Sequence, residues 1–142
     1  EYEYDFKTAP DRLRDLKANL PIIESRLAKL TPGPVNDHIP LLIGGSGEKV
    51  TLRLVAEHAD MWNSFGDPDE IARLSGILDD WCGKLGRNPA EIERSVLLRG
   101  PEQVALADQY VEKGITHLIV GATGPEWDLS LLQDLVNWRD KR

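Results

Sequence analysis

The residues best placed to do chemistry are Gly44, Gly45, Ser46 and Gly47, which together form a glycine turn. Glycine leaves backbone N–H groups open to close approach because it has no Cβ, and the beginning of a helix attracts an anion through its dipole. The glycine turn could therefore bind a phosphate, or it could be a tight strand-to-helix connection that needs only positive φ. It matches neither G-x-G-x-x-G nor a Walker-type G-K-[ST] ending.

Two further polar side chains lie where predicted strands end. Asn63 could reach a ligand, or it could belong to a strand-end turn. Arg99 is a cation placed directly after a strand, and it could pair with an anionic group or form a surface or interhelix ion pair. The loop at residues 121–124 follows the last predicted strand.

The other reactive residue types give no site. The histidines, His38, His58 and His117, are not spaced with another ligand as a metal site requires. Cys82 lies on the apolar stripe of a predicted helix, which is typical of an inert core thiol. No pair of carboxylates stands out as acid and base, and no serine lies in a nucleophile elbow. We therefore predict no metal and assign no catalytic residue.

The segment that positions the glycine turn spans residues 39–63. The apolar run at 41–43, bounded by Pro40 and the glycine turn, predicts a fully buried strand. Ser46 is predicted to cap a helix whose apolar residues recur at helical spacing. Residues 61–62 begin a second strand, so the segment predicts a βαβ unit with a parallel pair of strands.

The same kinds of signal place the other elements. An amphipathic helix begins near Asp11 and contains Pro21, which predicts a kink or two short helices in line, and a proline-rich linker occupies residues 31–40. Asp67 is predicted to cap a helix that ends at Gly86. The remaining predictions are strands at 96–98 and 118–120 and helices at 101–113 and 128–139.

Four strand–helix units after one helix predict half of a (β/α)8 barrel. We divide the chain into residues 1–38, an N-terminal helix with its linker, and residues 39–142, a (βα)4 half-barrel. The alternative is a small, open, doubly wound sheet. A parallel half-barrel has two open edges and one uncovered face, so a missing N-terminal half, a second copy or rearranged helices must cover them.

Composition narrows the class of protein. A chain of 142 residues with 41% hydrophobic and 29% charged residues is typical of one globular domain. Its net charge of −7 argues against nucleic acid or an anionic membrane as the main partner. A single cysteine and the lack of a long apolar run favour a cytoplasmic protein. The start, EYEYDF, has no initiator Met and resembles the beginning of a chain cut from a longer one.

The run PLLIGGSGEKVTLRLVAEHADMWNSFGDPDEI resembles the C-terminal half of luciferase-like monooxygenases. Within that superfamily it is most similar to the actinobacterial branch that uses the deazaflavin coenzyme F-420. Further matches lie at residues 82–95, 114–118 and 124–130, so the resemblance covers nearly the whole chain in order and spacing.

The resemblance implies a TIM barrel, of which this chain is the C-terminal half, and an oxidoreductase that transfers hydride between a substrate and F-420. It implies that Gly44, Gly45, Ser46 and Gly47 bind the cofactor's phosphate, with Thr51 one turn on. From their places after predicted strands, and not from the resemblance, Asn63 and Arg99 are our candidates for substrate binding. Most catalytic residues of the family come from the N-terminal strands, so this chain alone is predicted to be inactive.

Two alternatives stay open. FMN could replace the deazaflavin in a monooxygenase of the same fold, since both cofactors carry a phosphate on a similar tail. The chain could instead be a non-catalytic half-barrel that self-associates as a homo-oligomer, or a binding module for a phosphorylated ligand.

Overall fold

The computed structural model describes residues 3, 5–122 and 124–142, and the chain separates into two units, Glu1–Leu41 and Leu42–Arg142. Each unit has its own internal contacts and is described by itself. No helix within the described residues is long and apolar enough to cross a membrane.

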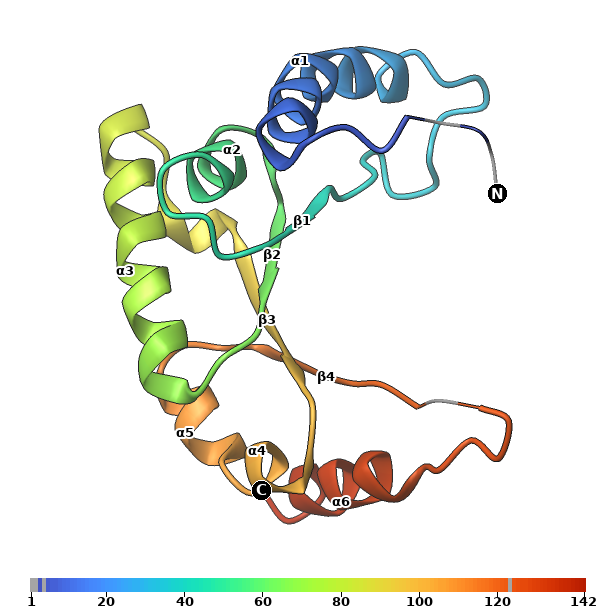
Figure 1. The fold of residues 1–142 in the computed structure, drawn as a ribbon, viewed down its shortest axis with the longest axis vertical. Coiled ribbons are helices and arrows are strands. Elements are labelled where there is room, and N and C mark those ends of the chain that lie inside the picture. The colour runs from blue at the N-terminus through green and yellow to red at the C-terminus, as the bar shows by residue number, and fades with distance from the viewer. Residues whose placement is uncertain (1–2, 4, 123) are drawn as a thin grey trace. The chain divides into compact units, whose positions relative to one another are not determined.

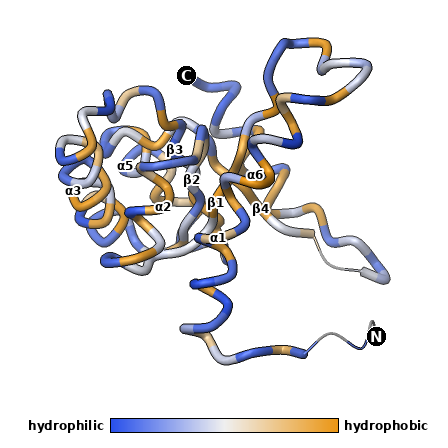
Figure 2. Tube along the Cα trace, turned by 90° about the horizontal axis from the view of Figure 1, so that it is seen from above, coloured by the Kyte–Doolittle hydropathy of each residue, from blue (hydrophilic) through white to orange (hydrophobic). Residues whose placement is uncertain are grey.

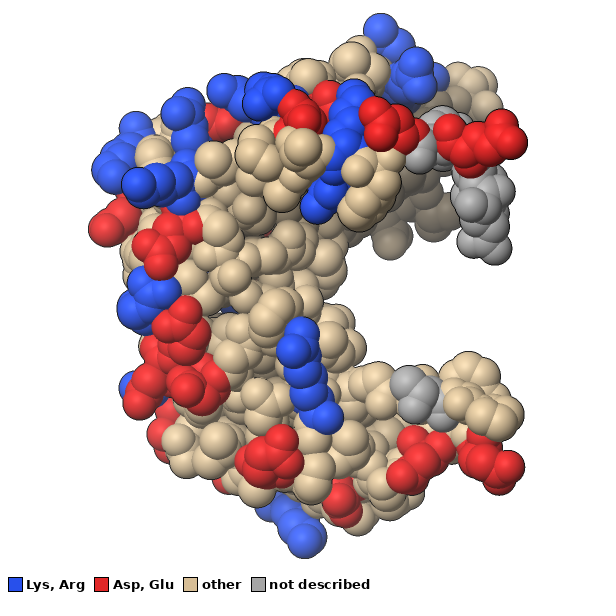
Figure 3. Space-filling model, in the orientation of Figure 1, with Lys and Arg blue, Asp and Glu red and all other residues tan. Residues whose placement is uncertain are grey.

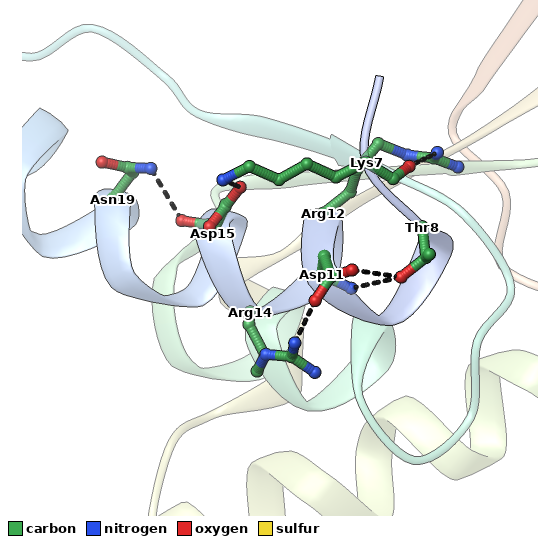
Figure 4. A network of polar contacts seen from close by, with 7 residues as sticks. All are labelled: Lys7, Thr8, Asp11, Arg12, Arg14, Asp15 and Asn19. Atoms are coloured by element: carbon green, nitrogen blue, oxygen red, sulfur yellow. Dashed lines mark hydrogen bonds and ion pairs between the residues drawn. The ribbon is translucent and has the colours of Figure 1, made fainter. Parts of the chain in front are cut away.

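The N-terminal unit is built on helix α1, Ala9–Leu27 (Figure 1). The Thr8 side chain caps it by accepting a hydrogen bond from the Asp11 backbone N–H at 3.4 Å, and Lys7 pairs with Asp15 at 2.8 Å (Figure 4). This carboxylate also raises the pKa of Lys7, chiefly through the hydrogen bond. Pro21 lies inside one continuous helix, so α1 is not split into two.

The second unit holds a parallel sheet of four strands in the order β1-β2-β3-β4. The strands are β1 Leu42–Gly44, β2 Met61–Ser64, β3 Glu93–Leu98 and β4 His117–Val120. Neighbours in the sheet are also neighbours along the chain, as in a (β/α)8 barrel. The predicted α/β fold with four parallel strand–helix units is confirmed.

Helices connect the strands and lie on one face of the sheet (Figure 1). They are α2 Thr51–His58, α3 Pro68–Leu85, α4 Pro101–Val104, α5 Ala107–Glu112 and α6 Ser130–Arg139, with a short 3-10 helix at Pro89–Glu91. On the face shown in Figure 3, acidic and basic side chains gather over α3, whereas uncharged residues fill most of the surface over the strands.

The core lies between the sheet and these helices. Alternate strand residues such as Ile43, Trp62 and Val96 point toward the helices and are buried, and Ile71 of α3 and Tyr110 of α5 pack on the same side. Figure 2 shows the hydrophobic residues of the strands and of the helix sides that meet them. Burial of apolar area in this layer is the main stabilising contribution to the unit.

The prediction that the first strand is fully buried is wrong. Only Ile43 of β1 is buried, and Leu42 is 49% exposed. The physical reason is that β1 is an edge strand, and no described helix of residues 42–142 lies on the face of the sheet opposite the core (Figure 1). Within residues 42–142, helices therefore cover only one face of the strand that carries Leu42, and they leave the other face uncovered.

Helix ends follow local signals in some places and not in others. The Asp67 side chain accepts from the Glu70 N–H at 2.8 Å, and Gly86 ends α3 in a left-handed conformation with φ +70°, as predicted. Ser46 does not cap α2, which begins at Thr51. The reason is that the Leu52 N–H donates to the Gly47 carbonyl, five residues back, and this wider turn precedes the helix.

Two later helices also differ from prediction. The segment 101–113 contains two helices, α4 and α5, because the Leu106 N–H bonds only three residues back, to Gln103, and this tight turn ends α4. The last helix begins at Ser130 rather than at residue 128.

Candidate functional site

The glycine turn follows β1 at the edge where the carboxyl ends of the strands meet (Figure 1). The Gly45 N–H donates to the Asn63 carbonyl at 2.9 Å, and the Trp62 indole N–H donates to the Gly45 carbonyl at 2.8 Å. Gly45 has φ +132°, a conformation that residues with a side chain rarely adopt. The first half of the turn is therefore fastened to β2 by two hydrogen bonds.

The other end of the turn is fastened to α3. The Trp81 indole N–H donates to the Glu48 carbonyl at 2.8 Å, and Arg73 donates to the Glu48 carboxylate at 2.8 Å. Hydrogen bonds to Glu70 and then to Glu48 raise the pKa of Arg73, and the bond from Arg73 lowers the pKa of Glu70. Hydrogen bonds to two neighbouring elements, β2 and α3, thus fasten both ends of the turn.

The N–H groups that the turn presents are free. Within the described part of the chain, the backbone N–H groups of residues 46–51 donate to no protein acceptor. Ser46 and Gly47 are exposed. A run of adjacent N–H groups at the beginning of a helix is a favourable environment for a phosphate, since the groups supply hydrogen bonds and partial positive charge.

Thr51 explains why glycine is needed here. A Cβ on Gly47 would lie 2.7 Å from Thr51 Oγ1, and one on Gly45 would lie 3.1 Å from Thr51 Cγ2. The Thr51 side chain is 8% exposed, and its hydroxyl makes no hydrogen bond with the described residues. The hydroxyl is therefore a donor beside the free N–H groups, and the turn fits a phosphate oxygen by its chemistry.

Asn63 is held beside the glycine turn. Its side-chain amide donates to Ser95 Oγ at 3.0 Å, and that hydroxyl donates to the Trp62 carbonyl at 2.9 Å. Gly44, Asn63 and Ser95 are register partners on the face opposite the helices. Asn63 is thus positioned by a side-chain hydrogen bond within the sheet, and its backbone carbonyl contacts the glycine turn.

Arg99 follows β3 and lies over an aromatic ring. Its guanidinium carbon is 4.0 Å from the centroid of Phe65, which follows β2 and is 46% exposed. The ion pair considered for Arg99 is not found among the described residues. Sequence reasoning missed Phe65, although an aromatic residue directly after a strand on this edge was a signal that could have found it.

The loops that carry Phe65 and Arg99 are tied together. Gln103 accepts from the Arg99 backbone N–H at 2.7 Å and donates to the Gly66 carbonyl at 3.3 Å. The buried Tyr110 hydroxyl also donates to the Gly66 carbonyl, at 2.7 Å, and burial raises the pKa of this phenol. Two helices after β3 thereby fix the loop after β2.

The remaining sequence candidates contribute no chemistry to this edge. His117 pairs with Glu93 at 3.5 Å at the opposite edge, and Cys82 is buried with the pKa of its thiol raised by burial. No group of His, Cys, Asp and Glu within the described residues could hold a metal ion. Of the candidate loop at 121–124, Thr123 lies outside the described residues.

Comparison with known proteins gives a likeness in fold. No family model and no curated protein matches the sequence. A solved F-420-dependent secondary alcohol dehydrogenase, in complex with an F-420–acetone adduct, is similar with a TM-score of 0.73 at 12% identity. A coenzyme F-420-dependent tetrahydromethanopterin reductase from Methanopyrus kandleri is similar with a TM-score of 0.50 at 13% identity.

These likenesses cover unequal shares of the chains. The first match covers 92% of this chain and 62% of the dehydrogenase, and the second covers 69% of this chain and 49% of the reductase. The chain is structurally similar to these two F-420-dependent enzymes at low sequence identity, and its four parallel strands with their helices match part of a TIM barrel. At these identities the likeness shows the fold alone.

Proposed function

We propose that this chain is part of a luciferase-like oxidoreductase that uses coenzyme F-420, and that the glycine turn binds the phosphate of the cofactor's tail. The observation that carries the proposal is the run of free N–H groups at residues 46–51, held rigidly on the edge of the sheet where barrel enzymes place their sites. The fold likeness to two F-420-dependent enzymes supports the choice of cofactor.

Each residue of the site has a role in this proposal. The glycine turn and the Thr51 hydroxyl donate hydrogen bonds to the phosphate, while Trp62 and Trp81 hold the turn in its binding shape. Asn63, whose carbonyl accepts from Gly45 at the turn, would contact the ligand next to the phosphate. When bound, the deazaflavin would supply the hydride chemistry, and the protein its position and surroundings.

The proposal leaves catalysis to residues outside this chain. The edge described here supplies anion-binding donors, an amide, an aromatic ring and a guanidinium, and among the described residues it presents no paired acid and base. We therefore propose that this chain by itself shows no turnover. Steady oxidation or reduction of F-420 by the 142-residue chain would contradict that statement.

The choice of cofactor is tested by titrating this chain with F-420 and, separately, with FMN. Isothermal titration calorimetry measures the affinity for each. Tighter binding of F-420 supports the proposal, and tighter binding of FMN favours the monooxygenase alternative. Inorganic phosphate should compete with either cofactor, because the tail phosphate occupies the glycine turn.

Gly47→Ala and Thr51→Val test the site within those titrations. The added Cβ of Gly47→Ala meets Thr51 Oγ1 at 2.7 Å, and Thr51→Val removes the hydroxyl while keeping the side-chain shape. Both should weaken phosphate binding. Gly76→Ala is the matched control, since nothing lies within 4 Å of a Cβ there and Ala in a helix interior should stabilise by about 0.5–1 kcal/mol. Equal phosphate affinity in all three variants would overturn the assignment.

A second candidate function follows from the uncovered face of the sheet. β1 and β4 are edge strands, and Leu42 of β1 is 49% exposed, so a second copy of the chain could pair edge to edge and close an eight-stranded barrel. In this alternative the chain is a self-associating half-barrel without catalysis. Sedimentation equilibrium separates the two: a stable monomer at micromolar concentration excludes self-association.

A further inference from the structure

Arg99 differs from the other arginines of its unit. Residues 42–142 contain seven arginines, and six of them have a carboxylate within 4.0 Å. These are Arg53, Arg73, Arg87, Arg94, Arg139 and Arg142. Arg99 has no carboxylate partner among the described residues, although the chain carries 24 acidic residues. A free guanidinium in so acidic a chain is available to bind an anion from solution.

The guanidinium is also held in place. Its guanidinium carbon lies 4.0 Å from the centroid of the Phe65 ring, in a cation–π contact. Gln103 accepts from the Arg99 backbone N–H at 2.7 Å and donates to the Gly66 carbonyl at 3.3 Å, so one side chain bridges the loop of Phe65 and the loop of Arg99. A planar fork of donors held this way matches a carboxylate or phosphate in bidentate geometry.

The position of Arg99 separates it from the phosphate site. Arg99 follows β3 and the glycine turn follows β1, with β2 between them. Neighbouring strands are about 4.8 Å apart, so the two sites are separated by roughly 10 Å along the edge. A phosphate held by the N–H groups of the glycine turn lies beside β1, two strands away from the loop that carries Arg99. A ligand that fills the glycine turn therefore leaves Arg99 for a second anionic group.

We infer that Arg99, stacked on Phe65, binds an anionic group of the substrate, and that the substrate class is a small carboxylate or phosphate ester with an apolar part beside the charged group. The statement that this ligand is a substrate rests on the proposed function. Anion binding at Arg99 rests on the geometry alone. The exposed part of Phe65 supplies the contact for the apolar part of the ligand.

The first test is a titration of the chain with benzoate, with neutral benzamide as the matched probe. The NMR signals of the arginine side-chain N–H groups report binding in both titrations. Benzoate should shift the Arg99 signal and benzamide should not. Arg99→Gln should weaken benzoate binding at least tenfold, and Arg99→Lys should restore only part of it, because lysine is a point charge without the planar fork. Arg53→Gln, which lies on α2, should leave it unchanged. Equal benzoate binding in wild type and Arg99→Gln overturns the inference.

A second set of titrations distinguishes this site from the cofactor site. Arg99→Gln should leave the affinity for F-420 and for inorganic phosphate within twofold, and Gly47→Ala should leave the affinity for benzoate within twofold. Loss of F-420 binding in Arg99→Gln would assign Arg99 to the cofactor and overturn the inference. If wild type binds benzoate through Arg99 and does not bind F-420, the proposed function fails and the anion site stands.

Discussion

The edge where the strands begin and the edge where they end differ in whether particular polar groups have partners within the protein. At the edge where the strands begin, Arg87 donates to the carbonyls of Ala56 at 3.1 Å and Ala59 at 2.8 Å and so caps the end of α2. Arg94 is paired with Asp79 on α3. At the edge where the strands end, the N–H groups of residues 46–51 and the Arg99 guanidinium have no such partners among the described residues.

The difference separates stability from binding within one small unit. Arg87 and Arg94 have partners inside the protein, at the end of α2 and on α3, and the groups without partners are those that we propose bind a ligand. The free groups are still held in place, because Trp62, Trp81 and Gln103 fix the backbone around them. This division is the one expected of barrel enzymes, where one face carries the site and the other carries stability.

The largest effect should come from Arg87→Ala. The Arg87 side chain is 21% exposed and donates to the carbonyls of Ala56 and Ala59 at the end of α2, so its removal leaves both acceptors without this partner. We expect a loss of about 3 kcal/mol of unfolding free energy in urea, with Arg87→Lys losing less. Arg53→Ala, an exposed pair on α2, should lose no more than about 0.5 kcal/mol. If both variants lose the same, the contrast between the edges is wrong.

Trp62→Phe should affect both stability and binding. It removes the indole N–H that donates to Gly45 and leaves most of the buried ring in place. We expect a loss of about 1–2 kcal/mol of unfolding free energy and weaker binding of inorganic phosphate. Trp81→Phe removes the corresponding bond to Glu48 at a more exposed position and should cost less. Unchanged phosphate binding in Trp62→Phe would show that the glycine turn keeps its shape without this bond.

Tyr110→Phe should cost about 1 kcal/mol through the lost hydrogen bond to Gly66. The effect should depend on pH. Burial raises the pKa of Tyr110, so above about pH 10 the unfolded chain releases this proton while the folded chain keeps it. The stability that Tyr110 contributes is therefore fully present below about pH 10 and falls as the pH rises. Urea unfolding at a series of pH values should show the wild type approaching Tyr110→Phe, and a constant gap would contradict the buried phenol.

The smallest effect on stability should come from Arg99→Gln. The side chain is exposed and its contact with Phe65 is one that contributes no more than about 0.5–1 kcal/mol. We expect a loss within that range in urea unfolding, together with the loss of benzoate binding described above. A loss as large as that of Arg87→Ala would mean that Arg99 holds the fold.

Much of this unit could be predicted from local sequence. Helix α3 begins and ends where Asp67 and Gly86 place it, because both signals act through backbone groups within three or four residues. The four strands lie where short apolar runs predicted them, although the first is not fully buried. The glycine turn could be found for the same reason.

The parts that prediction missed depend on distant residues. Ser46 was a plausible cap, yet α2 begins at Thr51, in a turn held by the indole of Trp81 from 33 residues further along the chain. Nothing near Arg87 in sequence indicates the carbonyls 28 to 31 residues before it. For Arg99, the sequence suggested an ion pair as one alternative. Its neighbour in the structure is Phe65, which comes from another loop, and this contact could not be found from the local sequence. These contacts exist only once the sheet has formed.

The sequential strand order also bears on how quickly the unit can assemble. Each new strand pairs with the one before it, as Leu42 with Met61, Met61 with Glu93 and Ser95 with His117, so every pairing closes a loop of about 20 to 30 residues. The entropic cost of closing the longest of these loops exceeds that of the shortest by only about 0.5 kcal/mol. No step waits for distant chain ends to meet, so the strands can add one after another, even while the chain is leaving the ribosome.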